Sequence, residues 1–399
     1  MLGERVPFLL AVLGIWTALR LYTTGVLVWI ATSEQDPSIY SGDVPRYFEV
    51  AALWDGQWYE RIATAGYPDS LPLDDSGQVR QNEWAFYPVF PFLARAVMLT
   101  GAPFSVAAVI VATLLGYAAA LVIAGLVKDV VGPVAALGTV ALVGAFPASP
   151  TMQVAYTESL AMLLLASALW LLAKRRWGAA ALVALLTGLA RPIALPLGLV
   201  ALVALIVRWR GRDDNPIDRR EWASMASALV ACGASGLMWP AIAWWGTRQS
   251  DAYTVTMSAW RQGEPISPFT PTIEIVQFLF GPTAGPVYLT IVLLAVVVAV
   301  LGPWARGLGP VMRTWCLGYP LYLFAALDPW TSIYRYLLPL FPLAIVLLGL
   351  GWERSDPRGR VPGWLTATRV AVFVGLFLAW QVWWTWELFM FVPPRDNPP

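Results

Sequence analysis

Residues Phe104–Val127 read FSVAAVIVATLLGYAAALVIAGLV, a run of 24 residues that contains no charged side chain. A helix of about 20 apolar residues is long enough to cross the hydrocarbon core of a bilayer. The rest of the chain has the same character, because hydrophobic residues make up 58% of its 399 residues and charged residues only 13%. A water-soluble protein needs roughly a quarter charged residues to cover its surface. Most of this chain therefore faces lipid.

Apolar runs of this kind recur along the chain, and they predict an all-α, multi-pass membrane protein with about eleven spans. The first run is too long for the apolar core of a signal peptide, so we read it as a retained anchor. The predicted spans are Val6–Ile30, Phe104–Val127, Pro133–Phe146, Ala155–Ala173, Gly178–Ala190, Ile193–Val207, Ala223–Trp245, Gly285–Leu301, Val311–Leu327, Ile333–Gly351 and Leu365–Trp386.

The orientation depends on Trp84–Leu99, WAFYPVFPFLARAVML, which is short and contains two prolines and Arg95. If this segment lies at the interface without crossing, the basic groups near Lys128, residues 174–176 and residues 208–220 all fall on one face. That face is cytoplasmic by the positive-inside rule. We therefore predict that Trp84–Leu99 does not cross, that the N-terminus is cytoplasmic and that the C-terminus is outside.

In this topology residues 1–392 form one multi-pass domain, followed by a disordered tail, 393–399. Two long loops lie outside, 31–85 and 246–284, and the first contains an excess of acidic residues. The net charge of +1 gives no electrostatic footprint for nucleic acid, and the absence of histidine excludes His-based zinc sites and catalytic triads. The acidic groups could bind a divalent cation through oxygen, but no spacing demands one, so no metal ligand is assigned.

The stretch SGDVPRYFEVAALWDGQWYERIATAGYP, residues 41–68, is the most informative part of the first loop. It predicts an interfacial helix with Asp43 as its N-cap and an end near Gly66. Trp54, Trp58 and Ile62 form a stripe that suits the headgroup layer. Asp55 lies beside the stripe, facing the protein or water, and Gly56 would loosen the helix there. A carboxylate in this setting is a candidate functional group.

Other ionisable residues fall at the same side of the predicted membrane. Glu158 lies early in a span, whereas Arg191 and Arg335 lie at outer turns, the latter opposite Asp328. Arg20 lies within the first span and could snorkel or pair with an acid such as Glu158. Ionisable residues at membrane depth are functional candidates by default, and arginine can bind phosphate oxygens with two parallel hydrogen bonds. The pattern predicts a site that holds a phosphate and activates a hydroxyl.

Five motifs resemble, in the same order, those of the PIG-V family of mannosyltransferases, which belongs to the GT-C superfamily of polytopic glycosyltransferases. The resemblance covers roughly residues 16–342. The motifs are LWDGQWYERIATAGYP (53–68), WAFYPVFP (84–91), YTESL (156–160), ARPIALPL (190–197) and YRYLLPLFP (334–342).

The resemblance implies a GT-C-like fold, a polyprenyl-phosphate sugar donor and an active site on the non-cytoplasmic face of the plasma membrane. It implies a catalytic acid in the first outer loop, beside helices that lie along the membrane, which maps to Asp55. It also maps the family's glutamate to Glu158 and its arginine to Arg191.

The predicted function is transfer of mannose from polyprenyl-phosphate-mannose to a hydroxyl of a lipid or glycan acceptor, with inversion implied by the resemblance. Asp55 is assigned as the base and Glu158 as a group that orients the acceptor or pairs with an arginine. Arg191, Arg335 and Arg20 are assigned as donor-phosphate ligands. Further residues assigned to substrate binding or support are Trp54, Trp58, Tyr59, Glu83, Tyr87 and Asp43.

The alternative function is that of a transporter or flippase for a lipid-linked solute. Transporters commonly contain paired repeats and broken helices around a site near the membrane midplane. No internal repeat is evident in this chain, and its polar groups gather near one face. This pattern favours the enzyme over the transporter, and a structural scaffold would explain neither the acidic loop nor the arginines within the spans.

Overall fold

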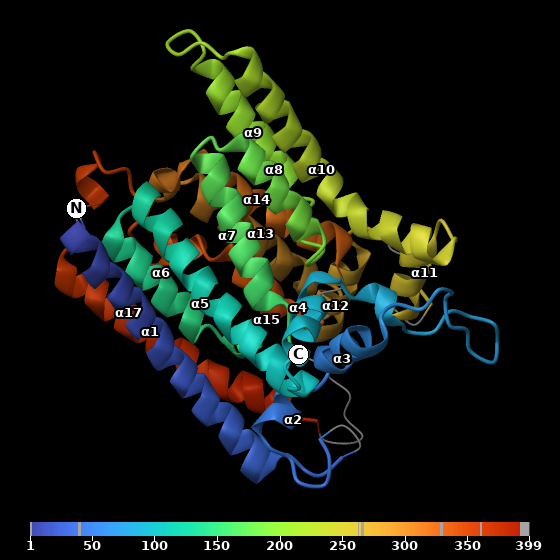
Figure 1. Ribbon diagram of the computed structural model, residues 1–399. Helices are drawn as coiled ribbons and strands as arrows, with labels where there is room; N and C mark the ends of the chain where they lie inside the picture. The colour runs from blue at the N-terminus through green and yellow to red at the C-terminus, as the bar shows by residue number, and fades with distance from the viewer. Residues whose placement is uncertain are drawn as a thin grey trace.

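The structure is a computed structural model whose regular elements are helices (Figure 1). It describes residues 2–38, 41–261, 263–264, 267–327, 330–359, 361–391 and 399. In these ranges extended residues pair only in two isolated bridges, Ser38 with Gly42 and Leu73 with Val79. The all-α prediction is confirmed for this part of the chain. The predicted disordered tail, 393–399, lies outside the described residues except for its last residue, Pro399.

The helices follow one another with short connections over most of the chain. The first ten are α1 (Leu2–Trp29), α2 (Tyr47–Ala51), α3 (Asp55–Ala65), α4 (Val89–Met98), α5 (Phe104–Val130), α6 (Pro133–Ala145), α7 (Glu158–Ala173), α8 (Trp177–Gly188), α9 (Leu197–Arg210) and α10 (Arg219–Thr247). The remaining α-helices are α11 (Ala252–Ala259), α12 (Thr270–Phe280), α13 (Ala284–Leu301), α14 (Gly309–Ala326), α15 (Ile333–Leu337), α16 (Leu343–Leu347) and α17 (Gly363–Trp384).

Short segments of other helical types occur between these helices or extend them. The π-helical turns η1 (Ile30–Glu34) and η7 (Thr385–Phe389) continue α1 and α17. The 3-10 turns are η2 (Glu83–Ala85), η3 (Ser149–Met152), η4 (Pro303–Leu308), η5 (Leu338–Leu340) and η6 (Pro357–Gly359).

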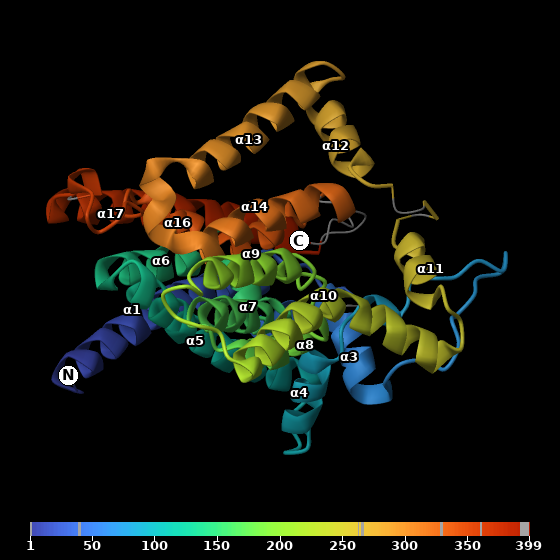
Figure 2. The ribbon, with the colours of Figure 1, turned by 90° about the horizontal axis from the view of Figure 1, so that it is seen from above.

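The main body is a packed group of helices in which α5 contacts both α6 and α7, and α8 contacts α7 and α10. Helices α1 and α17, from opposite ends of the chain, both pack on α6 at one edge of the body (Figure 1). The Thr23 hydroxyl lies 3.0 Å from Gln381 Oε1 and links these two helices. Helices α12 and α13 stand apart as an arm beside the body (Figure 2), and no residue of α12 is buried.

Several helices are long and apolar enough to cross a membrane. A helix of 27 residues such as α5 is roughly 40 Å long at 1.5 Å per residue, more than the ~30 Å hydrocarbon core. Long apolar helices in this number indicate a membrane-embedded protein. Among the described residues, five helices meet these criteria of length and composition: Pro7–Glu34, Phe104–Val130, Arg219–Thr247, Ala284–Leu301 and Gly363–Phe389.

The predicted span Ile333–Gly351 is not one helix. It is divided into α15, the 3-10 turn η5 and α16, each no longer than five residues. Proline lacks the backbone N–H that an α-helix needs and clashes with the preceding turn. Pro339 and Pro342 therefore interrupt the helix, and the prediction of a continuous span here is wrong.

Close contact between α8 and α10 depends on a glycine. A Cβ atom on Gly188 would lie 2.2 Å from the carbonyl oxygen of Ser235 in α10. No side chain fits at that distance, so the two backbones touch directly. Small residues that let helices approach closely are typical of helix packing in membranes. This contact fixes α8, and Arg191 follows shortly after its end.

The first loop contains two short helices where the sequence predicted one. Helix α2 begins at Tyr47, and its N-cap residue is Arg46, which makes no side-chain capping bond. Asp43 is exposed and lies outside the helix, so the prediction that it caps the helix is wrong. Pro45 explains the later start, because the residue before a proline is biased away from helical conformation. The second helix, α3, begins at Asp55.

Candidate functional site

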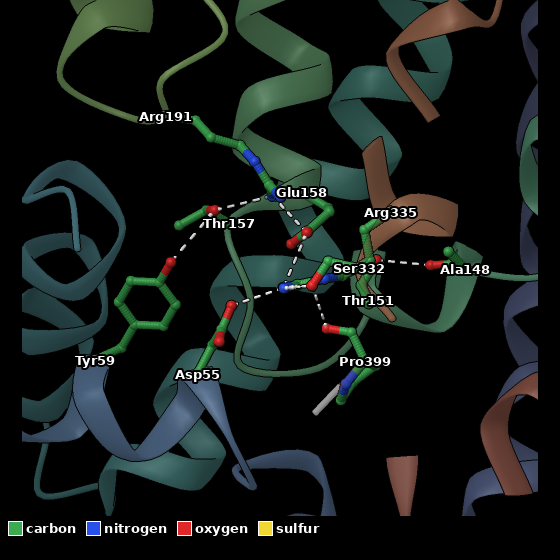
Figure 3. Close-up of polar contacts among 10 residues, drawn as sticks. All are labelled: Asp55, Tyr59, Ala148, Thr151, Thr157, Glu158, Arg191, Ser332, Arg335 and Pro399. Atoms are coloured by element: carbon green, nitrogen blue, oxygen red, sulfur yellow. Dashed lines mark hydrogen bonds and ion pairs between the residues drawn. The ribbon is translucent and has the colours of Figure 1, made fainter. Parts of the chain in front are cut away.

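Four of the predicted residues converge in a buried ion-pair network at one end of the helical body (Figure 3). Arg335 Nη1 lies 2.6 Å from Asp55 Oδ2 and 3.4 Å from Glu158 Oε1. The same Glu158 oxygen forms an ion pair with Arg191 Nη1. The sequence expectation that these ionisable groups lie near one another is confirmed by their positions, while their chemical roles stay predictions.

Asp55 is placed by an unusual backbone conformation at the residue before it. Trp54 has φ of 59° and ψ of −117°, which is a strained combination for a bulky side chain. The Trp54 ring is held in place because its Nε1 donates a hydrogen bond of 3.1 Å to the Phe389 carbonyl. The turn lets α3 start at Asp55 with the carboxylate directed at Arg335 (Figure 3).

The predicted role of Gly56 is not what the structure shows. Gly56 lies inside α3, and a Cβ atom there would come within 3.2 Å of the Ala155 Cβ. The Ala155 N–H in turn donates to the Ala51 carbonyl at 2.9 Å. Gly56 therefore permits close packing against the segment before α7. The interruption in the helix comes one residue before Asp55, at Trp54.

Glu158 is the first residue of α7 and its side chain is almost completely buried. Both of its ion pairs use Oε1, and Oε2 has no hydrogen-bond partner among the described residues. A buried carboxylate is costly unless opposite charges compensate it. Arg191 and Arg335 provide that compensation from two directions. Glu158 is thus the group that joins the two arginines into one network.

Arg335 is the most connected member of the network. It leaves α15 with only 7% of its side chain exposed. Besides the two carboxylates, its Nη2 donates a hydrogen bond of 3.0 Å to Ser332 Oγ. Its guanidinium carbon lies 5.0 Å from the centre of the Tyr156 ring, within cation–π range. The Asp55 carboxylate is more open, with 23% of its side chain exposed.

A cavity of about 350 Å³ opens beside this network. Asp55, Arg191 and Arg335 line it together with aromatic side chains and a further arginine, Arg261. The predicted residues Tyr59 and Tyr87 also line it, whereas Glu158 lies behind Arg191 and Arg335. The Tyr87 hydroxyl is 3.2 Å from that of Tyr253. The remaining lining residues are Ala85, Phe86, Thr157, Ala190, Pro192, Ile193, Met257, Trp260, Leu327, Trp330, Thr331, Ser332 and Tyr336.

Tyr59 contributes a neutral hydroxyl to the cavity. Burial raises the pKa of Tyr59 above its ordinary value, and the negative charge of Asp55 raises this pKa further. The phenol therefore stays protonated at neutral pH. It donates a hydrogen bond of 3.5 Å to the Thr157 hydroxyl, which Arg191 Nη1 contacts at 3.4 Å.

Trp58 and Glu83 lie beside a second, more open cavity of about 840 Å³, formed by the first loop and α11. The Trp58 ring stacks on Phe86 with centroids 5.6 Å apart and meets Trp260 edge-on. These three rings separate the two cavities. Ile62, predicted to lie in the headgroup layer with Trp54 and Trp58, is fully buried in the protein, so the interpretation of that stripe is wrong.

Arg20 and Asp43 are not part of the site. Arg20 is buried in α1, where Nη1 donates to the Ser149 carbonyl at 2.8 Å and Nη2 to the Gly144 carbonyl at 2.7 Å. The Gly144 carbonyl lies in the last turn of α6 and the Ser149 carbonyl in η3, so both Nη atoms are bonded without a carboxylate. Arg20 therefore does not contact Glu158, contrary to the pairing that the sequence suggested. Asp43 is exposed in the first loop.

Arg261 is the main cavity residue that the sequence did not single out. It follows α11 in the loop 246–284, which the sequence predicted to lie outside, and its immediate surroundings contain no motif of charged residues. The only signal in the sequence was its position directly after Trp260, in a loop predicted to lie on the same side of the membrane as the site. Asp328, which the sequence placed opposite Arg335, lies outside the described residues.

The site combines one partly open carboxylate with several arginines, a composition suited to proton removal beside an anion. In the part of the chain that the structure describes, no group of three or more acidic or cysteine side chains is arranged to hold a metal ion. Both cysteines, Cys232 and Cys316, are buried and unpaired. No protein-family model matches this chain, and no curated protein matches it either.

Proposed function

We propose that this protein is a membrane-embedded mannosyltransferase that transfers mannose from polyprenyl-phosphate-mannose to an acceptor hydroxyl on the non-cytoplasmic side. The observation that carries the proposal is the cavity in which the Asp55 carboxylate faces a wall containing Arg191, Arg261 and Arg335. The family resemblance of the motifs around Asp55, Glu158 and Arg335 supplies the choice of sugar and donor. The membrane-embedded, all-helical fold is the setting that such an enzyme requires.

The reaction needs a base for the acceptor hydroxyl and positive charge for the departing lipid phosphate. Asp55 Oδ2 is bonded to Arg335, and Oδ1 has no hydrogen-bond partner among the described residues. In the proposed reaction Oδ1 takes the proton of the acceptor hydroxyl while its oxygen attacks the anomeric carbon. The bond from that carbon to the phosphate oxygen breaks, and the lipid phosphate leaves with the electron pair. A single displacement of this kind inverts the anomeric configuration.

A general acid is less necessary here than in glycoside hydrolysis, because a phosphate is already a good leaving group. One carboxylate base together with arginines is therefore sufficient to catalyse the proposed transfer. Arginine stays charged at every working pH and its planar guanidinium matches phosphate oxygens. The buried position of the network strengthens these electrostatic interactions, because few water molecules screen them.

An apolar groove next to the site supports a lipid-linked donor. A hollow of about 490 Å³ lies between α6, α13, α17 and the segment that contains α15 and α16. Leu337 and Leu338 line this groove, while Arg335 and Tyr336, directly before them, line the site cavity. In the proposed complex the hydrocarbon chain of a lipid phosphate held in the cavity lies in this groove. Burial of each CH₂ group contributes about 0.8 kcal/mol to such binding.

The proposal includes a topology of about eleven crossings, with the broken segment Ile333–Gly351 as one of them, a cytoplasmic N-terminus and a GT-C-like arrangement. Asp55, Glu158, Arg191 and Arg335 belong to segments that this topology places at the outer face. Helix α4, ten residues long, is too short to cross a bilayer by itself, in keeping with the interfacial placement of Trp84–Leu99.

The test is a transfer assay with purified protein in lipid nanodiscs. Radiolabelled polyprenyl-phosphate-mannose is incubated with the protein and a lipid extract from the native membrane, and polyprenyl-phosphate-glucose serves as the sugar control. The expected result is that the label appears in a new mannosylated product and that polyprenyl phosphate is released as the second product. Movement of intact donor across a liposome membrane without any new product would instead establish the transporter alternative.

A further inference from the structure

The site cavity contains one arginine whose charge is not balanced by a carboxylate. Arg335 pairs with Asp55 and Glu158, and Arg191 pairs with Glu158. Arg261 lies in the same cavity and forms no ion pair among the residues that the structure describes. Among the described residues of the site, three arginines and two carboxylates leave one net positive charge.

The Arg261 guanidinium is fixed in position but only partly bonded. Its Nη2 donates a hydrogen bond of 3.2 Å to the Ala326 carbonyl at the end of α14. Its Nη1 is buried and has no hydrogen-bond partner in the described structure. The backbone is set by a tight turn, because the Arg261 N–H donates to the Ser258 carbonyl at 2.8 Å. The guanidinium is therefore held at the cavity wall with a donor unused.

A buried, charged donor without a partner is unfavourable, since burial removes its hydrogen bonds to water. Such a group is expected where an anionic ligand completes the site. Arg335 and Arg191 are less suited to that role, because an incoming phosphate would compete with carboxylates already bonded to them. Releasing Arg191 or Arg335 from Glu158 would also leave that buried carboxylate partly uncompensated.

We propose that Arg261 is the principal ligand of the donor phosphate, and that Arg191 and Arg335 act mainly as positioning residues for Glu158 and Asp55. This inference rests on the proposed function, which supplies the lipid phosphate as the anion. It changes the assignment made from the sequence, in which Arg191, Arg335 and Arg20 hold the phosphate. The base and the phosphate ligand then come from different outer loops.

The experiment measures binding of polyprenyl phosphate, which has no sugar, to wild type, Arg261→Gln and Arg261→Lys in nanodiscs. A charged hydrogen bond of this kind corresponds to roughly a 10- to 100-fold change in Kd. We expect Arg261→Gln to weaken binding by that factor and Arg261→Lys to weaken it less, since lysine keeps the charge but loses the planar fork. Arg248→Gln, an exposed arginine in the same outer loop, is the matched control.

Steady-state kinetics provide a second readout. Arg261→Gln should raise the KM for donor with a smaller effect on kcat. Unchanged polyprenyl-phosphate binding by Arg261→Gln would overturn the inference and leave the proposed function standing. If Arg261→Gln weakens polyprenyl-phosphate binding but wild type transfers no mannose, Arg261 remains a phosphate ligand and the proposed transferase is refuted. If Arg261→Gln does not fold, the test uses Arg261→Lys, and equal binding of polyprenyl phosphate by wild type and Arg261→Lys overturns the inference. Failure of wild type to bind polyprenyl phosphate also overturns it.

Discussion

At the scale of single residues, the site is organised around carboxylates that differ in their surroundings. The Asp55 side chain is 23% exposed and reaches the cavity, whereas the Glu158 side chain is 3% exposed and lies behind it. A group that exchanges a proton with a substrate must reach that substrate. The difference in exposure therefore assigns proton transfer to Asp55 and a supporting role to Glu158 in the proposed mechanism.

Replacement of Asp55 by Asn tests this assignment. The amide keeps the size and shape of the carboxylate but cannot accept the hydroxyl proton. General-base catalysis typically contributes about 10²–10⁴-fold, so kcat should fall by that order. Transfer assays on Asp55→Asn measure the loss, and Asp43→Asn in the same loop, which is exposed, should stay near wild type. Full activity of Asp55→Asn together with loss of activity in Asp43→Asn would move the base to Asp43.

Replacement of Glu158 by Gln should affect stability as well as activity. The substitution leaves Arg191 and Arg335 with one buried negative charge fewer, and breaking a buried ion pair in this way costs about 3–5 kcal/mol. We expect a clearly lower thermal unfolding temperature for Glu158→Gln. Glu49→Gln, at an exposed position of α2, is the control and should unfold like wild type. Equal melting of both variants would show that the network contributes nothing to stability.

The candidate site could be predicted in part from the sequence because ionisable residues are conspicuous in apolar surroundings. Asp55, Glu158, Arg191 and Arg335 were found in this way, and they do converge. Arg20 has the same appearance in the sequence, but both of its Nη atoms donate to backbone carbonyls. Only the three-dimensional structure distinguishes an arginine that is bonded to carbonyls from one that is bonded to carboxylates.

At the scale of helices and loops, hydrophobic runs predicted most helices but not where they break. Helix α5 spans Phe104–Val130, close to the predicted Phe104–Val127, since an uncharged run of that length has no other stable form in lipid. The break at Trp54 was not foreseeable, because a positive φ is uncommon for a bulky residue and the Trp54 ring is bonded to a carbonyl 335 positions away. The prolines within Ile333–Gly351 indicate a break in the helix, and the prediction of a continuous span did not take them into account.

The α8–α10 contact provides a test at this scale. Gly188→Ala places a methyl group where the Ser235 carbonyl oxygen lies, so the helices must separate or bend. Overpacking of this kind costs about 1–3 kcal/mol, and we expect Gly188→Ala to lower the unfolding temperature. Gly178→Ala, in the same helix, meets nothing within 4 Å and should be neutral or slightly stabilising. The reverse order of the two variants would contradict the close backbone contact.

At the scale of the whole molecule, the proposed site depends on elements from along the entire chain. Asp55 and Arg335 are 280 positions apart, and Arg261 comes from a loop between them. The sequence predicted that Asp55 and Arg335 belong to one site but did not include Arg261, and neither composition nor periodicity determines which helices pack together. The arm formed by α12 and α13 is an example, since its separation from the body has no counterpart in the hydrophobic pattern.

The proposed orientation can be tested with single cysteines and a membrane-impermeant maleimide. Gln81→Cys lies in the first outer loop, and Lys174→Cys lies in a basic cluster on the opposite face of the predicted topology. In intact cells we expect labelling of Gln81→Cys alone, and labelling of both after the membrane is permeabilised. The native cysteines are buried and should react little. Labelling of Lys174→Cys in intact cells would refute the topology.

The contacts of Trp54 and Asp55 with the C-terminal part of the chain also bear on when the site geometry is complete. A ribosome releases Asp55 long before Arg335, and the carbonyl that holds Trp54 is 335 residues further along the chain. Until η7 has been synthesised, the Trp54 ring lacks the hydrogen bond to the Phe389 carbonyl, and until α15 has been synthesised, Asp55 lacks its ion pair with Arg335. A partly synthesised chain thus exposes a lone carboxylate and no assembled site. Under the proposed function, catalytic competence would then appear only late in biosynthesis, once Asp55 and Arg335 can pair.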